Sequence, residues 1–225
     1  MARRIKWLMI KTKLNINELY GFFYKNTFNS LSEFGFLNVE INKSEILSTY
    51  VEVHTSYQEY IDPLGGRHEQ RLVSHVVFDF FIESTDKGFF LLSIINPPKS
   101  IKKFVDFISS SFNYNVSFSI VNLCLTDVID RINSCSDVNL LLINKINVSN
   151  FKLNDSSIAS VEIISKINAL REIDIYTKGL SYSIDKIKGS MLFYDKKIIF
   201  EISKSSLVVS DDEVKISLLN KIIHG

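Results

Sequence analysis

Apolar and polar residues alternate along much of this chain, which is the pattern of half-buried β-strands. The alternation begins near the N-terminus and returns several times toward the C-terminus. Strands are expected over residues 5–14, 36–41, 89–95, 116–123, 140–146 and 161–165, and near Tyr182, Met191 and Ile199.

The strongest pattern predicts a long antiparallel hairpin. Residues 46–61 and 71–83 are rich in β-branched and aromatic residues, and residues 62–66 read Asp-Pro-Leu-Gly-Gly between them. Proline presets φ and glycine permits positive φ, so this segment predicts a turn. We therefore expect a hairpin over residues 46–83, continued by the strand at 89–95.

Shorter segments show the three- and four-residue apolar spacing of amphipathic helices. Asn15 and Glu18 form a capping-box pattern at the start of one helix, and Ser100 or Lys99 begins another. Thr126 begins a third helix, and a short one is expected around Ala169. A second capping box, Ser210 to Glu213, predicts a helix at the C-terminus.

Strands in runs with few helices predict an α+β fold, with a mainly antiparallel or mixed sheet and a few packed helices. Residues 149–157 are the most polar stretch and favour a boundary between two small modules. One module would span 1–148 and contain the long hairpin. The other, over 155–225, would be smaller and β-rich and end in the C-terminal helix.

The net charge of +1 hides an uneven distribution. Residues 33–86 hold ten acidic and three basic residues, whereas the first thirteen residues hold five basic residues and none that is acidic. An acidic hairpin and a basic remainder favour charge-guided association. Charged edge strands that avoid mispairing would give the same asymmetry, and this second interpretation stays open.

Composition and cysteine count predict a cytoplasmic protein. The two cysteines, Cys124 and Cys135, are too few for a disulfide framework. No apolar run is long enough for a membrane helix, and Lys11 and Lys13 interrupt the only segment that resembles a secretory signal. Many Ile, Lys and Asn residues and few Ala and Arg residues are typical of A/T-rich genomes, which suggests a bacterial, phage or mobile-element gene.

The hairpin also contains the only cluster of candidate catalytic or metal-binding residues in the sequence. Three of the four histidines lie within 22 residues, among several carboxylates. A metal site would draw on His54, His68, His75 and Glu52, and an acid–base site on His54, His75 and Asp79. The spacing matches no established metal or hydrolase motif, so surface histidines are the simpler interpretation.

These observations favour a non-catalytic binding or assembly subunit of a bacterial or phage complex, which would include antiviral defence systems. Protein partners are expected, further copies of the chain and nucleic acid stay open, and no cofactor is expected. The residues assigned to partner binding are Glu52, Glu59, Asp62 and Glu69. Two alternatives stay open: a metal-dependent hydrolase or nuclease that uses the histidine cluster, and a nucleic-acid-binding protein. The latter would contact phosphates through its basic N-terminus, with Arg3, Arg4, Lys6, Lys11 and Lys13.

Overall fold

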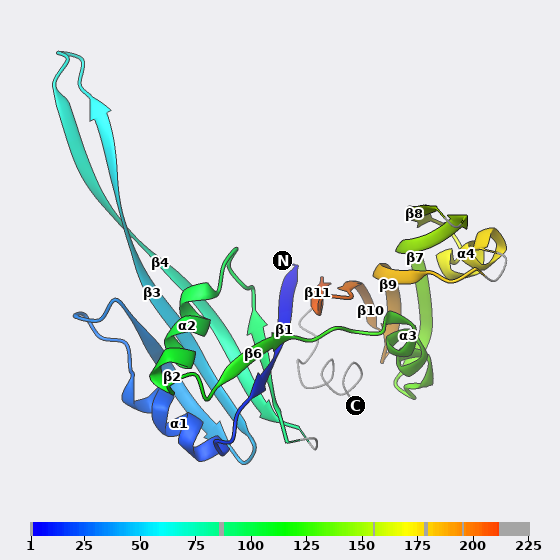
Figure 1. Ribbon diagram of the computed structural model, residues 1–225, viewed down its shortest axis with the longest axis horizontal. Coiled ribbons are helices and arrows are strands. Elements are labelled where there is room, and N and C mark those ends of the chain that lie inside the picture. The colour runs from blue at the N-terminus through cyan, green and yellow to red at the C-terminus, as the bar shows by residue number, and fades with distance from the viewer. Residues whose placement is uncertain (1, 86–87, 155, 178–179, 195, 212–225) are drawn as a thin grey trace. The chain divides into compact units, whose positions relative to one another are not determined.

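The computed structural model describes residues 2–85, 88–154, 156–177, 180–194 and 196–211 (Figure 1). These residues form eleven strands and four helices. The strands are β1 (Arg3–Lys11), β2 (Phe34–Asn42), β3 (Glu45–Ile61), β4 (Arg67–Ser84), β5 (Phe90–Ile95), β6 (Ser117–Ile120), β7 (Val138–Asn154), β8 (Ser157–Ile164), β9 (Ser183–Phe193), β10 (Lys196–Ser203) and β11 (Leu207–Ser210). The helices are α1 (Ile16–Lys25), α2 (Lys102–Ser111), α3 (Leu125–Ser134) and α4 (Ala169–Thr177).

The predicted α+β class is wrong, because antiparallel β-sheet dominates the structure. Each helix has only nine or ten residues, whereas β3, β4 and β7 have seventeen or eighteen. The sequence pattern located most elements but underestimated their length. The strands continue through polar residues that break the apolar alternation, since cross-strand backbone hydrogen bonds do not require apolar side chains.

The chain divides into two compact units, which are described separately here. Residues 9–119 form the hairpin unit, and residues 1–8 together with the chain from 120 onward form the C-terminal unit. Strand β1 contributes residues to both. The polar stretch 149–157 lies where β7 pairs with β8, inside the C-terminal unit.

In the hairpin unit, strands β2, β3, β4 and β5 lie in that order and pair antiparallel. The predicted hairpin is confirmed, with each residue of β3 from Glu45 to Ile61 facing one of β4 from Glu83 to Arg67. Phe36, Tyr50 and Phe80 are buried on one face of this sheet against Phe23 of α1 and Phe104 of α2. These rings form the core of the unit.

The predicted start of α1 is also confirmed. The Asn15 side chain accepts a hydrogen bond from the Glu18 amide at 3.0 Å, and the Glu18 carboxylate accepts one from the Asn15 amide at 2.7 Å. This reciprocal pair satisfies two amides that the helix cannot pair internally. The cap fixes the position at which α1 begins to cover the sheet.

In the C-terminal unit, strands β11, β10, β9, β7 and β8 lie in that order, and the first residues of β1 pair antiparallel with β11. Helix α3 contacts β7 and β9, and α4 contacts β7 and β8. At Gly189, a Cβ would collide with the backbone carbonyl of Leu142, so only glycine fits between β9 and β7.

The predicted C-terminal helix lies outside the described residues. Its expected cap, Ser210, is the last residue of β11 and is buried. Asp211 follows it and accepts a hydrogen bond from the Ile199 amide at 2.8 Å. None of the described helices has the length and hydropathy needed to span a bilayer.

Candidate functional site

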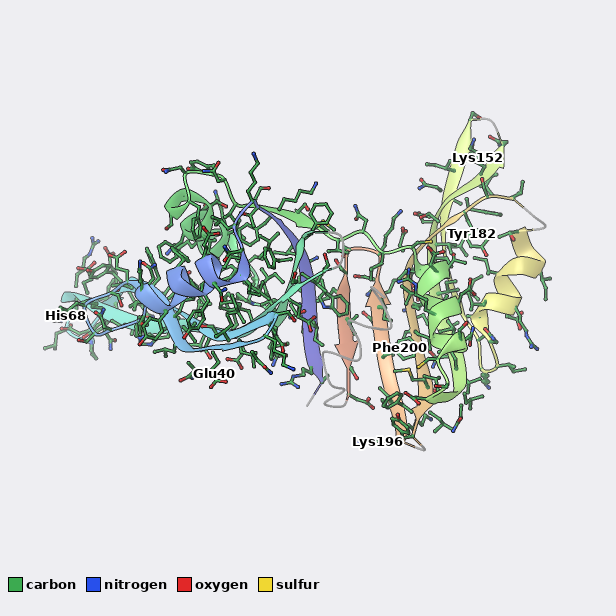
Figure 2. All side chains as sticks on the ribbon, turned by 90° about the horizontal axis from the view of Figure 1, so that it is seen from below. Glu40, His68, Lys152, Tyr182, Lys196 and Phe200 are labelled. Carbon is green, nitrogen blue, oxygen red and sulfur yellow. The ribbon has the colours of Figure 1, made fainter. Side chains whose placement is uncertain are left out.

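The outer part of the β3–β4 hairpin, residues 54–75, extends beyond the rest of its sheet and is called the arm below. Pairing with β2 ends at Glu52, and pairing with β5 ends at Phe80. Outside these limits β3 and β4 pair, among the described strands, only with each other. Figure 1 shows the arm reaching past β2 and the helices of its unit, and Figure 2 places His68 near its outer end.

The arm exposes both of its faces. All of its residues are exposed except Asp62 and Gly66, which are half-buried. Its apolar side chains include Tyr57, Ile61 and Leu64, which are 62%, 67% and 97% exposed. A two-stranded ribbon without a core is marginally stable in water, and grouped exposed apolar side chains are typical of interaction surfaces.

Asp62 organises the tip of the arm. One carboxylate oxygen accepts hydrogen bonds from the amides of Leu64 and Gly66, both at 2.8 Å, and the other lies 2.7 Å from Nε2 of His68. Gly65 supplies the positive φ, 86°, that the turn requires. The His68 bond, followed by the bond from the Gly66 amide, holds the pKa of the Asp62 carboxyl below its usual range. The structure therefore uses this predicted partner-binding residue to form the turn.

Glu52 lies at the base of the arm, where its side chain is only 9% exposed. One carboxylate oxygen is 2.8 Å from Nζ of Lys103 in α2 and 3.2 Å from Nε2 of His54. The other accepts a long hydrogen bond of 3.4 Å from the hydroxyl of Tyr50. Burial, followed by the charge of Glu52, raises the pKa of Tyr50, so the phenol stays protonated and can donate. These contacts hold α2 against the sheet at the point where the arm begins.

The histidine cluster that the sequence left open as an alternative does not form among the described residues. His54 faces Ser74 across the hairpin, whereas His75 faces Val53. Directly opposed residues share a face and neighbouring residues alternate, so Glu52 and His54 lie on one face and His75 and Asp79 on the other. Among the described residues, no group of three His, Cys, Asp or Glu side chains is placed to hold a metal ion.

The remaining acidic candidates, Glu59 and Glu69, face each other directly across the arm. Arg67 and Arg71 are their diagonal neighbours on the same face. In the part of the chain that the structure describes, none of these four side chains forms an ion pair. Like charges in direct opposition destabilise a hairpin, so this pair costs the free arm some stability.

The five basic N-terminal candidates are divided between the two units. Arg3, Arg4 and Lys6 lie in the part of β1 that pairs with β11, with Arg3 on the opposite face from Arg4 and Lys6. Lys11 and Lys13 belong to the hairpin unit. The run of positive charge in the sequence therefore does not form one patch within either unit.

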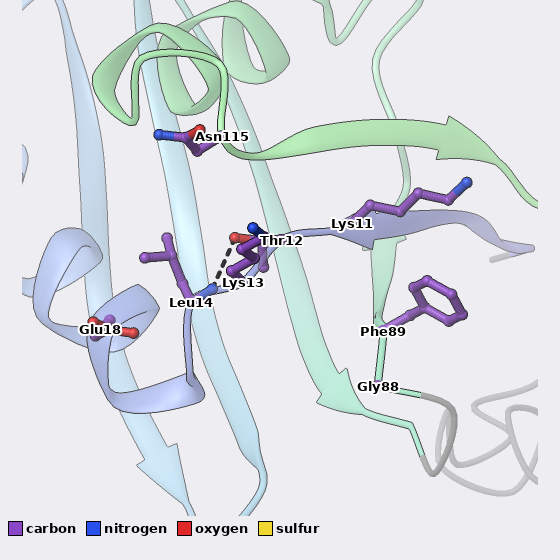
Figure 3. Close-up of a pocket in the computed structure, with 8 residues that line it drawn as sticks. All are labelled: Lys11, Thr12, Lys13, Leu14, Glu18, Gly88, Phe89 and Asn115. Atoms are coloured by element: carbon purple, nitrogen blue, oxygen red, sulfur yellow. Dashed lines mark hydrogen bonds between the residues drawn. The ribbon is translucent and has the colours of Figure 1, made fainter.

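Lys11 and Lys13 line a cleft of about 570 Å³ in the hairpin unit. Thr12, Leu14, Glu18 and Asn115 are among its other lining residues. Figure 3 shows the Lys11 side chain extending away from Asn115 and Glu18, so the cationic and polar groups do not converge on one point. The hydroxyl of Thr12 is used locally, since it accepts a hydrogen bond of 3.1 Å from the Leu14 amide. The cleft therefore has no arrangement that specifies a ligand.

Sequence reasoning missed the partners of Glu52 and the apolar residues of the arm. Lys103 comes from a helix fifty residues away, and no local pattern connects it to Glu52. The exposure of the arm could have been predicted from the lengths of the expected strands. The expected strands at 36–41 and 89–95 are much shorter than the hairpin strands beside them, so they cannot pair with the whole hairpin.

Neither a protein-family model nor a curated protein sequence matches this chain.

Proposed function

We propose that this protein is a non-catalytic binding or assembly subunit that engages a protein partner through the arm, residues 54–75. The observation that carries the proposal is the exposure of both faces of the arm over about half the length of two long strands. None of its apolar side chains belongs to the buried core of the part of the chain that the structure describes. A partner that covers them would supply the burial that the arm lacks.

The edges of the arm offer a second mode of contact. Beyond the pairing limits of β2 and β5, the outward-facing amides and carbonyls of β3 and β4 have no neighbouring strand among the described elements. An extended segment of a partner can add itself to such an edge through backbone hydrogen bonds. Alternate side chains, such as Tyr57 and Ile61 on one face, would then set its specificity.

The charge of the arm favours a protein over a nucleic acid. Glu59, Asp62 and Glu69 outnumber Arg67 and Arg71, which gives a net charge of −1 with neutral histidines. Phosphate backbones bind surfaces with an excess of lysine and arginine. The polar groups near the arm also support a non-catalytic role, since Lys103 binds the Glu52 carboxylate and the turn engages that of Asp62.

The test is photo-cross-linking from the arm in the cell that encodes the protein. A benzoylphenylalanine in place of Tyr57 should form a stoichiometric cross-link to one protein, and the complex should survive nuclease treatment. The same group in place of Leu153, an equally exposed residue of the β7–β8 hairpin, is the matched control and should not form it.

A pair of double variants gives the complementary readout. Tyr57→Ser with Ile61→Ser should abolish co-purification of that protein, and Leu153→Ser with Ile158→Ser should preserve it, because all four side chains are exposed. Co-purification that is unchanged by the arm variant, or lost on nuclease treatment, would overturn the proposal.

A further inference from the structure

The sheet of the C-terminal unit has two unlike faces. Ile143, Ile187 and Phe200 lie on the buried face, in line with the contacts that α3 and α4 make with β7, β8 and β9. Residues that alternate with them, such as Lys188 and Ile199, are exposed. The second face, called the outer face below, therefore presents a second set of side chains to the surroundings.

One half of the outer face is basic. Lys145 and Glu201 lie on either side of Lys188 in neighbouring strands, and Lys186 follows at the next position on that face. The carboxylate of Glu201 is 2.8 Å from Nζ of Lys186, and that of Glu162 is 2.9 Å from Nζ of Lys145. Lys188 is exposed and has no ion-pair partner among the described residues. Lys197 is also exposed and without an ion-pair partner there, but it lies two rows further along the same face, beside Leu192. The band therefore keeps positive charge that the sheet does not neutralise.

The other half of the outer face is aliphatic. Leu142, Ser190 and Ile199 form one row across β7, β9 and β10, and Leu140 and Leu192 belong to the next row. Leu140, Leu142 and Ile199 are exposed. Stacking of nucleic-acid bases uses aromatic rings, which these five side chains do not supply. An aliphatic patch beside a basic band fits a surface that is itself apolar and acidic.

The hairpin unit carries such a surface. Glu40, Glu45, Asp79 and Glu83 lie on the sheet face opposite the aromatic core, together with half-buried Leu47 and Phe81. Glu45 and Glu83 oppose each other directly. Burial, followed by the charge of Glu83, raises the pKa of Glu45. The sequence between residues 33 and 86 contains ten acidic residues and only three basic ones, so this face offers carboxylates to a cationic partner.

We propose that the outer face of the C-terminal unit in one copy docks on this acidic face of the hairpin unit in a second copy. Aliphatic side chains would pack face to face as in sheet-on-sheet packing, while lysines approach the Glu40 and Glu45 carboxylates. The two surfaces differ, so the contact is head-to-tail and continues from copy to copy as a ring or a filament. The inference goes beyond the proposed function, because neither surface includes the arm.

The test uses two charge-reversed variants and sedimentation velocity. Lys188→Glu with Lys197→Glu reverses the basic side, and Glu40→Lys with Glu45→Lys reverses the acidic side. Wild-type protein should form species larger than the 25.8 kDa monomer at low salt and should dissociate as salt rises. Each variant alone should be monomeric. Their equimolar mixture should assemble again, because the acidic face that the first variant retains can bind the basic face that the second variant retains.

The control is Lys152→Glu with Lys166→Glu, which makes the same charge change at exposed lysines outside the proposed contact and should assemble like wild type. If Lys188→Glu with Lys197→Glu does not fold, as judged by circular dichroism, Lys188→Gln with Lys197→Gln should still weaken assembly at least tenfold. Wild-type protein that stays monomeric at every salt and protein concentration would overturn the proposal, as would a mixture of the two variants that stays monomeric. Either result leaves the arm's cross-linking outcome unaffected, so the two proposals fail separately.

Discussion

The inner and outer halves of the β3–β4 hairpin share one register but have different surroundings. In the inner half, Tyr50, Phe78 and Phe80 are buried beneath α1 and α2, and β2 and β5 pair with both edges. In the outer half, Tyr57 and Tyr60 also carry large rings, yet both are exposed. Both halves of the hairpin therefore carry aromatic residues, but only those of the inner half are buried. Whether a strand residue is buried thus depends on the helices and strands that pack beside it.

The difference also separates the residues that stabilise the fold from those that we propose for partner binding. The inner half contributes to the core, so its side chains are constrained by packing. The arm contributes few contacts, so its side chains are available to a partner.

The largest effect should come from the inner half. Phe80→Ala removes a fully buried ring that contacts Phe23, Phe36 and Phe104, and should lower the free energy of unfolding by about 3–5 kcal/mol. Tyr57→Ala, in the arm, should change it by less than about 0.5 kcal/mol. Urea denaturation of both variants measures the two changes in the free energy of unfolding. Equal losses for Tyr57→Ala and Phe80→Ala would contradict the difference between the two halves.

An intermediate effect is expected at the junction of the two halves. Lys103→Ala leaves the buried Glu52 carboxylate without its ammonium partner, which should cost about 1–3 kcal/mol. Glu52→Gln should cost less, because the Lys103 side chain is 62% exposed and stays hydrated. Lys102→Ala, at the neighbouring exposed lysine of α2, is the control for lost helix charge. Equal unfolding free energies for Lys102→Ala and Lys103→Ala would show that Glu52 does not need the pair.

The smallest effect should be confined to the tip. The lowered pKa of Asp62 means that its carboxylate stabilises the turn above its ordinary pKa of 3.8, and that this contribution is lost as pH falls through the lowered value. The protection of the Leu64 and Gly66 amides from exchange, relative to their intrinsic rates at the same pH, should therefore fall below pH 3.8 in wild type. Asp62→Asn keeps an acceptor oxygen but cannot titrate, so amide exchange at the tip of this variant should not show this pH-dependent change. A change of the same size in Asp62→Asn would assign it to another group.

The sequence predicted the hairpin, its turn and the α1 cap because these depend on residues close together in the chain. Asp62, Gly65 and the pair Asn15 and Glu18 each act within a few positions. The predicted fold class was wrong for two reasons. The segments with helical apolar spacing form helices of only about three turns, and strands continue through polar sequence such as residues 149–154.

The candidate site was less predictable than the fold. His54 and His75 lie on opposite faces of the hairpin, because His75 pairs with Val53 and not with His54. Only the exact register of the two strands shows this. A shift of one residue would have changed that result. The contact between Glu52 and Lys103 depends on how α2 packs, which no local pattern specifies.

The central claim is that the arm serves binding rather than folding. The direct measurement replaces residues 55–73 by Asn-Gly, which joins the opposed residues His54 and Ser74 by a two-residue hairpin turn. The account predicts an unfolding free energy within about 1 kcal/mol of wild type and complete loss of the partner that cross-links at position 57. A truncated protein that fails to fold, or one that folds and still binds that partner, would contradict it.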